Sequence, residues 1–328
     1  MRRIVWIVLL LLLCAAGCGD THLSSKERVL PETEAVTEYR EELDIIPEKT
    51  QRIVCWGDSL TFGEGGDGVT FPLVLGEKTG LEVINYGVQG ETAEQIGLRM
   101  GAFSMRVGSF EIPQEAVPVE VSLQYLGEDP VMMRLGDSGI NPCCIAGIEG
   151  TLTYDASDDH YYFTRLQEGN ALEVAEGEPI ETFASGDRRE SDIIILFAGT
   201  NRAPDIGAVG ELIDAEKQML DYLGTERYLV IGLTSLALVP DAEPINEALT
   251  EEFGAHFLDI RTYLLEHGLE DAGIEPTGQD RADLAAGEIP SSLRVDIVHG
   301  NEAFYRIIGE QVFLKLKEMG YLLEENGK

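Results

Sequence analysis

The fold is decided by the stretch Arg52-Ile53-Val54-Cys55-Trp56-Gly57-Asp58-Ser59-Leu60, which passes from an apolar run into a small polar turn. The run Ile53–Trp56 predicts a buried strand. Gly57 has no side chain, so the backbone can turn sharply where the strand ends. Open α/β folds place their ligands and reactive groups at the carboxyl ends of the strands. We therefore expect Ser59 to be presented at the edge of a sheet.

The same alternation of apolar runs and helical periodicity continues along the chain. Further strands are predicted at 82–86, 192–198, 228–234 and 256–259. Helices are predicted at 71–80, 92–101, 210–224, 243–254 and 301–319. Strands that alternate with helices build parallel sheets covered on both faces. The sequence thus predicts an α/β fold, a three-layer, doubly wound parallel sheet.

Three more polar segments border predicted strands or the last helix: Asn85-Tyr86-Gly87-Val88-Gln89-Gly90, Gly199-Thr200-Asn201 and Asp296-Ile297-Val298-His299. A serine hydroxyl such as that of Ser59 needs a base to take its proton, and His299 is the candidate. Asp296, three residues earlier, would orient the imidazole and stabilise its charged form. The amides of Ser59 and Gly90 and the side chain of Asn201 are the candidate donors to an oxyanion.

This constellation resembles the SGNH hydrolase superfamily, also called GDSL esterases, over roughly residues 50–100 and 190–320. In that family the first block carries the nucleophile, which matches Ser59. The glycine of the second block matches Gly90, the Gly-x-Asn of the third matches Asn201, and the Asp-x-x-His of the last matches Asp296 and His299. The resemblance implies a flavodoxin-like fold and ester hydrolysis without a metal or other cofactor.

One part of the last block departs from the family pattern. Members often continue His-Pro-Asn-x-x-Gly-Tyr, whereas this chain reads His299-Gly300-Asn301-Glu302-Ala303-Phe304-Tyr305. Neither missing residue performs chemistry, so the departure concerns the geometry of the loop.

Residues 104–189 show a different hydrophobic pattern from the segments on either side. Alternation in period two recurs at 117–123, 150–154 and 160–166, and turn residues separate these runs. This pattern is typical of short antiparallel strands. It predicts a β-rich subdomain inserted between residues 50–103 and 190–328 of the catalytic domain. The insertion is either a substrate-binding wall or a stabilising or docking module.

A second long segment, Arg261–Val295, precedes Asp296. Its glycines and prolines favour an ordered loop or short turns over a long helix. Its position in the sequence makes it a candidate rim for the active site.

The N-terminus has the features of an export signal. A basic Met1-Arg2-Arg3 is followed by an apolar run, Ile4–Leu13, and by small residues before Cys18. This resembles a bacterial lipoprotein signal over residues 1–17, with lipidation of Cys18; the alternative is an ordinary secretory signal. The polar residues 18–49 would then form a tether. Both alternatives export the protein, and the first anchors it to a membrane through lipid alone.

Composition restricts the partners. The 328 residues carry a formal net charge of −35. This argues against nucleic acids and other polyanions as partners. The cysteines show no spacing typical of a disulfide framework or a zinc site, and Cys143 and Cys144 are expected to be free thiols. Asp155–Asp159 is either a calcium loop or, as we expect, a hairpin turn. Nothing in the sequence indicates an oligomeric state.

The sequence therefore predicts an exported serine esterase. The expected substrate is a small acyl ester, such as an acetyl ester, with acylated polysaccharide as the expected class; both choices follow from the resemblance and the export signal. Alternatives of the same fold are a lipase, lysophospholipase, thioesterase or acyltransferase. An alternative of another class is a surface lipoprotein that binds glycans.

Overall fold

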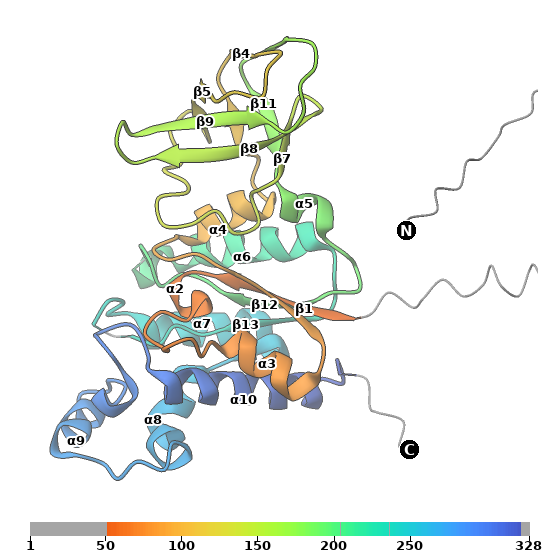
Figure 1. Cartoon of the computed structure of the whole chain (residues 1–328). Helices are drawn as coiled ribbons and strands as arrows, with labels where there is room; N and C mark the ends of the chain where they lie inside the picture. Colours follow the sequence, from red (N-terminus) through yellow and green to blue (C-terminus); the bar gives the residue numbers. More distant parts are fainter. Residues whose placement is uncertain (1–50, 204, 236, 323–328) are drawn as a thin grey trace, which may run out of the picture. The chain divides into compact units, whose positions relative to one another are not determined.

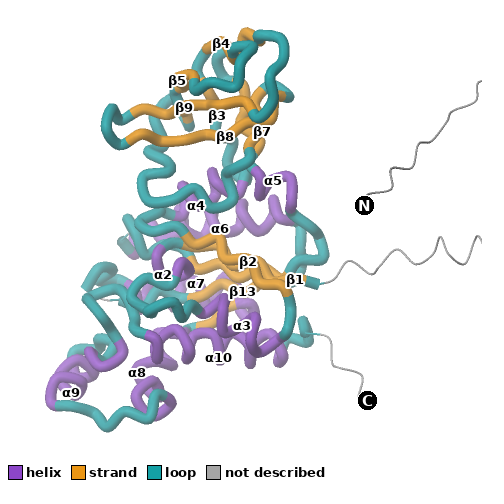
Figure 2. The backbone as a smooth tube through the Cα atoms, in the orientation of Figure 1, coloured by secondary structure: helices purple, strands orange, loops and turns teal. Residues whose placement is uncertain are grey.

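The computed structural model describes residues 51–203, 205–235 and 237–322. The signal sequence, Cys18 and the tether lie outside the described residues. The centre of the described part is a parallel sheet of five strands in the order β14-β13-β12-β1-β2 (Figures 1 and 2). Their bounds are β1 (Arg52–Gly57), β2 (Glu82–Gly87), β12 (Ile193–Phe197), β13 (Tyr228–Ile231) and β14 (Phe257–Leu258). The expected mixed α/β fold with a parallel sheet is confirmed.

Hydrophobic side chains are buried on both faces of this sheet, because successive residues of a strand point to opposite sides. Val54 and Trp56 join one buried cluster, which includes residues of the helices α4 (Ala93–Met100), α6 (Val209–Leu223) and α7 (Ala242–Phe253). Ile53 and Cys55 join another, with α3 (Phe71–Thr79), α8 (Ile260–Asp271) and α10 (Glu302–Glu318). In Figure 1, α4 and α6 lie on one side of the sheet and α3 and α10 on the other.

Two threonines cap the N-termini of α3 and α4. Thr70 Oγ1 accepts a hydrogen bond of 3.1 Å from Leu73 N at the start of α3. Thr92 and Gln95 form a reciprocal capping box at the start of α4. Such caps satisfy amide groups that have no partner within the helix and stabilise it by about 1 kcal/mol.

Residues 106–181 form antiparallel strands and carry one sheet of seven, in the order β5-β9-β8-β7-β11-β3-β6, and a separate pair, β10-β4. The bounds are β3 (Arg106–Val107), β4 (Phe110–Ile112), β5 (Val119–Val121), β6 (Leu123–Gln124), β7 (Cys143–Ile145), β8 (Ile148–Asp155), β9 (His160–Arg165), β10 (Leu172–Val174) and β11 (Glu178–Glu181). The short helix α5 (Phe183–Asp187) leads back to the parallel sheet.

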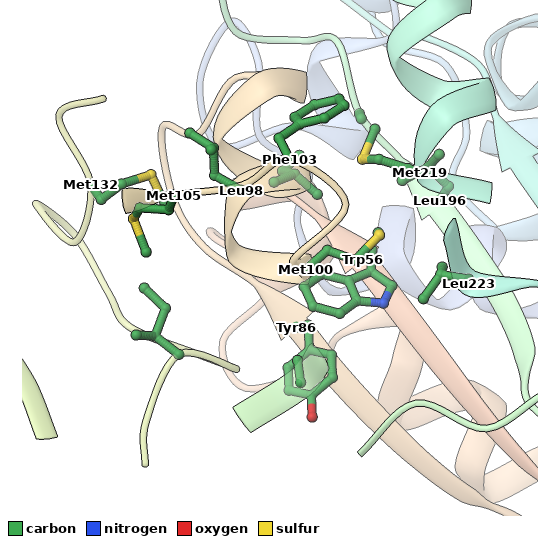
Figure 3. Packing of buried hydrophobic residues seen from close by; sticks show 14 of the residues in the cluster. Trp56, Tyr86, Leu98, Met100, Phe103, Met105, Met132, Leu196, Met219 and Leu223 are labelled. Atoms are coloured by element: carbon green, nitrogen blue, oxygen red, sulfur yellow. The ribbon is translucent and has the colours of Figure 1, made fainter. Parts of the chain in front are cut away.

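The β-rich segment shares its core with the parallel sheet. Figure 3 shows Trp56 and Tyr86 of the sheet beside Met100 of α4, with Met105 and Met132 of the β-rich segment in the same cluster. The described residues between 51 and 322 belong to one compact unit. Because packing is continuous, the orientation of the β-rich segment against α4 is determined by buried contacts.

The segment Arg261–Val295 corrects an expectation. Most of its first part belongs to α8, a helix of 12 residues, and α9 (Gly278–Ala285) and a 3-10 turn (Ser291–Leu293) follow. Gly268 does not interrupt α8; a Cβ there would lie 2.7 Å from Leu293 Cδ1, so the glycine permits close packing. The prediction of loops and short turns holds for residues 272–277 and 286–290. It was wrong for α8, because tertiary burial outweighs the low helix propensity of glycine.

The acidic run Asp155–Asp159 is the turn of the β8–β9 hairpin, in which Asp155 pairs with His160. Asp159 accepts from the Tyr154 hydroxyl at 2.8 Å and Asp158 from the Tyr162 hydroxyl at 2.6 Å. These carboxylates therefore have partners within the hairpin. Across the described part of the chain, no three His, Cys, Asp or Glu side chains gather in a way that could hold a metal ion.

The cysteines of the described part are free thiols. Burial raises the pKa of Cys143 to about 12, and it also raises the pKa of Cys55. High pKa values make these thiols poor nucleophiles. In the same residues, no helix has both the length and the apolarity needed to cross a membrane.

Candidate active site

Ser59 lies where β1 ends and the short helix α2 (Ser59–Phe62) begins. The Asp58 carboxylate accepts from Leu60 N at 2.9 Å and thereby caps this helix. A Cβ on Gly57 would lie 2.1 Å from Thr61 Oγ1 and 2.4 Å from the Phe197 carbonyl oxygen. Gly57 is thus required by the close approach of its neighbours, not by a positive φ. Ser59 is only 4% exposed, so most of this residue is covered by its neighbours.

The structure brings Ser59, His299 and Asp296 together across 240 residues of sequence. His299 Nε2 lies 2.9 Å from Ser59 Oγ, and His299 Nδ1 lies 2.7 Å from Asp296 Oδ2. These distances are those of hydrogen bonds. The arrangement has the geometry of a nucleophile, a base and an orienting carboxylate.

The loop that carries Asp296 is held by its own backbone. Asp296 Oδ1 accepts from Val298 N at 2.7 Å and from His299 N at 2.6 Å. Burial alone would raise the pKa of Asp296, but these bonds and the one from the His299 ring outweigh it and hold the pKa below its usual value. Ser235 Oγ donates to the Ile297 carbonyl at 2.6 Å. Asp296 is therefore ionised at neutral pH and rigidly placed.

The loop after β2 lies against the nucleophile turn. Val88 N donates to the Gly57 carbonyl at 3.1 Å, and Asn85 Nδ2 donates to the Thr61 carbonyl at 2.9 Å. Gly90 has a φ of 73°, a conformation that favours glycine. Within the described residues, neither the Ser59 amide nor the Gly90 amide donates a hydrogen bond. Two N–H groups are thus free for an oxyanion.

Asn201 lies at the same edge of the sheet but is already partnered. Its Nδ2 donates to the Glu91 carbonyl at 3.0 Å and lies 3.4 Å from Asp58 Oδ2. Gly199, at φ 99°, lets the chain turn against Leu212 before this residue. The contact with Glu91 ties Asn201 to the loop of Gly90, which places the candidate donors side by side.

A buried ion pair behind this loop was not predicted from the sequence. Arg99 of α4 is fully buried and donates to Glu91 Oε2 through Nη2 at 2.7 Å and through Nε at 2.9 Å. It also donates to the Ser138 carbonyl at 2.8 Å and lies 5.2 Å from the centroid of the Trp56 ring. An arginine between Leu98 and Met100 on a helix was the available signal. Arg99 thus joins the Gly90 loop, β1 and the β-rich segment.

Asp58, beside the nucleophile, was also not predicted. It is fully buried. Burial raises its pKa to about 7, although the hydrogen bond from Leu60 N acts in the opposite direction. A group whose pKa is higher in the folded than in the unfolded state stabilises the fold only while it is protonated. Its contribution is complete below about pH 4 and is lost as the pH rises through 7.

We expect Asp58→Asn to increase stability at alkaline pH, because it removes a buried negative charge and keeps an acceptor for Leu60 N. The free energy of unfolding should exceed that of the unmodified protein by up to about 4 kcal/mol at pH 8, and the difference should vanish towards pH 4. Urea titrations at pH 4, 6 and 8 measure it. A difference independent of pH would contradict the assignment.

Two cavities adjoin Asn201. One, of about 320 Å³, is lined by Gly90 and by Val131, Met133 and Leu135 of the β-rich segment. Gln95 Nε2 anchors this wall by donating to the carbonyls of Pro130 and Val131, each at 3.1 Å. The other, of about 430 Å³, lies towards α6 and is edged by Phe103 and Tyr125. The β-rich segment thus contributes to both cavities beside the oxyanion donors.

No protein-family model matches the chain, and no curated protein matches it. Among solved structures it is similar to a member of the lipolytic protein G-D-S-L family from Veillonella parvula DSM 2008, with 15% identity and a TM-score of 0.42, over 83% of this chain and 100% of that one.

It is also similar to a peptidoglycan O-acetylesterase, with 13% identity and a TM-score of 0.37, over 82% of this chain and 91% of that one. A third similar structure is a carbohydrate esterase family 2 enzyme with a carbohydrate-binding domain from Corynascus thermopiles (Myceliophthora fergusii). It has 12% identity and a TM-score of 0.40, over 83% of this chain and 67% of that one.

Similarity at this level decides nothing about the chemistry of the chain, which must come from its own residues. The solved structures to which this chain is similar are G-D-S-L lipolytic proteins and carbohydrate esterases.

Proposed function

We propose that this protein is a serine esterase that hydrolyses small acyl esters of carbohydrates. The observation that carries the proposal is the continuous hydrogen-bonded chain from Ser59 Oγ through His299 to Asp296, beside two amides with no acceptor. We further propose that the parallel sheet is the centre of a three-layer, doubly wound catalytic domain over residues 50–103 and 190–328, with residues 104–189 as its insertion.

The proposed reaction follows from the geometry. Ser59 Oγ attacks the ester carbonyl carbon while its proton passes to His299 Nε2. The carbonyl electron pair moves to the oxygen, and the amides of Ser59 and Gly90 stabilise that charge. Asn201 joins them as a donor when its side chain turns from the Glu91 carbonyl towards the oxyanion. Asp296 stabilises the imidazolium. The bond to the alcohol then breaks as Nε2 returns its proton to the leaving oxygen. A water molecule, deprotonated by Nε2, next attacks the acyl group on Ser59, and Ser59 Oγ leaves with that proton as the acid is released.

A carbohydrate alcohol is supported by the larger cavity beside Asn201. Phe103 and Tyr125 stack with their ring centroids 6.1 Å apart at its edge. The polar side chains of Glu94, Glu211 and Gln218 are also among the residues that line it. Aromatic edges with a few polar groups suit the alternating apolar and hydroxyl surfaces of a sugar ring. The acetyl ester is the choice that the family resemblance implies.

A second candidate function is hydrolysis of longer acyl esters. The smaller cavity beside Gly90 is lined by Val131, Met133 and Leu135, and the first and last of these are exposed apolar side chains. An apolar wall next to the oxyanion donors favours an acyl chain of several carbons.

A panel of p-nitrophenyl esters of increasing chain length, with acetylated oligosaccharides, separates the two functions. We expect the highest kcat/KM with acetate, and we expect Tyr125→Ala to lower kcat/KM about tenfold on the oligosaccharides relative to p-nitrophenyl acetate, with Tyr125→Phe retaining most activity. Values of kcat/KM that rise with acyl chain length and do not change in Tyr125→Ala would favour the second candidate.

We also propose that the protein is exported and anchored through lipid on Cys18, which the sequence pattern supports. Cys18→Ala should move the protein from the membrane fraction to the medium or leave an uncleaved precursor. Fractionation followed by determination of the N-terminus measures this. Membrane retention with a normally cleaved N-terminus would contradict lipidation.

A further inference from the structure

Glu64 lies beside the candidate catalytic residues, and its main chain is firmly held. Its amide donates to the Ser59 carbonyl at 3.0 Å. Its carbonyl accepts from the hydroxyl of Tyr305 at 2.6 Å, and Tyr305 is a buried residue of α10. Glu64 is therefore attached to the end of the nucleophile's helix on one side and to the core on the other.

The Glu64 carboxylate is also fixed in place. Its Oε2 accepts from Gln89 Nε2 at 2.9 Å, and Gln89 directly precedes Gly90. The same oxygen lies 3.9 Å from His299 Nε2. With 41% of its side chain exposed, Glu64 faces solvent. A carboxylate thus connects the nucleophile's helix to the oxyanion loop, beside the nitrogen that exchanges the proton.

This position puts the carboxylate on the leaving-group side of the reaction. His299 Nε2 must come within about 3 Å of the departing alcohol oxygen to return its proton. Groups on the carbon that neighbours the ester-bearing carbon then lie within reach of Glu64 Oε2. The other charged groups of the triad region, Asp58 and Asp296, are also acidic, and Arg202 lines the cavities on the Asn201 side. Among the described residues, no lysine or arginine forms an ion pair with Glu64, and His299 is the basic side chain beside it.

We propose that Glu64 selects the alcohol of the substrate. It favours esters that carry an electropositive group, a hydroxyl hydrogen or a cationic centre, on the carbon next to the ester-bearing carbon, and it rejects esters with an anion there. This inference rests on the proposed esterase function. A vicinal hydroxyl is what a sugar offers beside an ester, whereas acylated acids are excluded. A hydrogen bond to a charged group should change the ratio of kcat/KM between esters with and without this group by about 10- to 100-fold.

The test measures kcat/KM for four acetyl esters: 2-hydroxyethyl acetate, 2-methoxyethyl acetate, acetylcholine and acetoxyacetate. Each rate is divided by the rate of hydroxide hydrolysis, which removes differences in intrinsic reactivity. We expect the unmodified protein to prefer 2-hydroxyethyl over 2-methoxyethyl acetate by about tenfold or more and to cleave acetoxyacetate most slowly. Acetylcholine carries a positive charge but no hydroxyl, so its rate separates recognition of charge from recognition of a hydroxyl.

Glu64→Gln keeps an acceptor but loses the charge, so it should lower the hydroxyethyl to methoxyethyl ratio about fivefold. It should also raise the relative rate on acetoxyacetate about tenfold, because the repulsive charge is gone. Glu64→Asp should still reject acetoxyacetate while weakening the hydroxyl preference. The matched control is Glu115→Gln, which makes the same charge change at an exposed position of the β-rich segment and should leave every ratio unchanged.

The two levels of the proposal fail in different ways. If p-nitrophenyl acetate and all four esters remain intact in the presence of the unmodified protein, the esterase function fails, and the role of Glu64 with it. If the esters are cleaved and the ratios are the same in the unmodified protein and in Glu64→Gln, the role of Glu64 is overturned and the esterase function stands.

Discussion

Ser59→Ala is expected to lower kcat for a small ester by about 10⁴- to 10⁶-fold. The variant loses the oxygen that lies 2.9 Å from His299 Nε2 and that forms the bond to the acyl group. The Ser59 amide remains, so the oxyanion donors are intact and a small residual rate over water is expected. The measurement is the initial rate with p-nitrophenyl acetate, and mass spectrometry detects the acetyl-enzyme that only the serine can form.

Loss of activity must be separated from loss of structure. In the described residues, the Ser59 side chain donates no hydrogen bond to a helix cap or to the core. The free energy of unfolding of the variant, measured by thermal denaturation, should therefore match that of the unmodified protein within about 1 kcal/mol. Ser104→Ala, at an exposed position, is the matched control and should retain activity. Substantial turnover by purified Ser59→Ala would refute the assignment of the nucleophile.

Arg99→Met is expected to destabilise the fold by about 3–5 kcal/mol. Methionine fills a similar volume, but Glu91 then keeps a buried carboxylate without its cation. Burial raises the pKa of Glu91 even with Arg99 present, so without Arg99 this carboxyl should take up a proton. The destabilisation should therefore be smaller at pH 5 than at pH 8. Urea titrations at both pH values give the free energy of unfolding.

The double variant Glu91→Leu with Arg99→Met is the control, because it removes both charges together. It should recover most of the lost stability, since apolar replacement of a whole buried pair is often neutral. Activity is the second readout: the pair holds the loop of Gly90 against Gly57 and Ser138, so the double variant should fold but hydrolyse esters more slowly. Less than about 1 kcal/mol of destabilisation by Arg99→Met alone would show that the pair does not support the loop.

Local patterns were enough to predict the parallel sheet and its principal helices. The apolar run before Gly57 became β1, and the helix predicted at 301–319 became α10 to within a residue at each end. Hydrophobic periodicity and turn-forming residues are local features, because they involve residues that are close in sequence. Ser59, His299 and Asp296 could be named as candidate site residues for the same reason, since each follows or borders a strand or helix that the pattern defines.

The tertiary structure decided what depends on distances between segments. Helix α8 forms because Ile260 and Leu264 are buried, although its sequence contains Gly268. Arg99 and Glu91 are ordinary charged residues in the sequence, and only burial turns them into an ion pair behind the Gly90 loop. Glu64 faces His299 because two segments 235 residues apart meet at the edge of one sheet. The sequence determines the chemical type of each side chain. Its partners and its exposure to water depend on packing between distant segments, which local sequence patterns do not reveal.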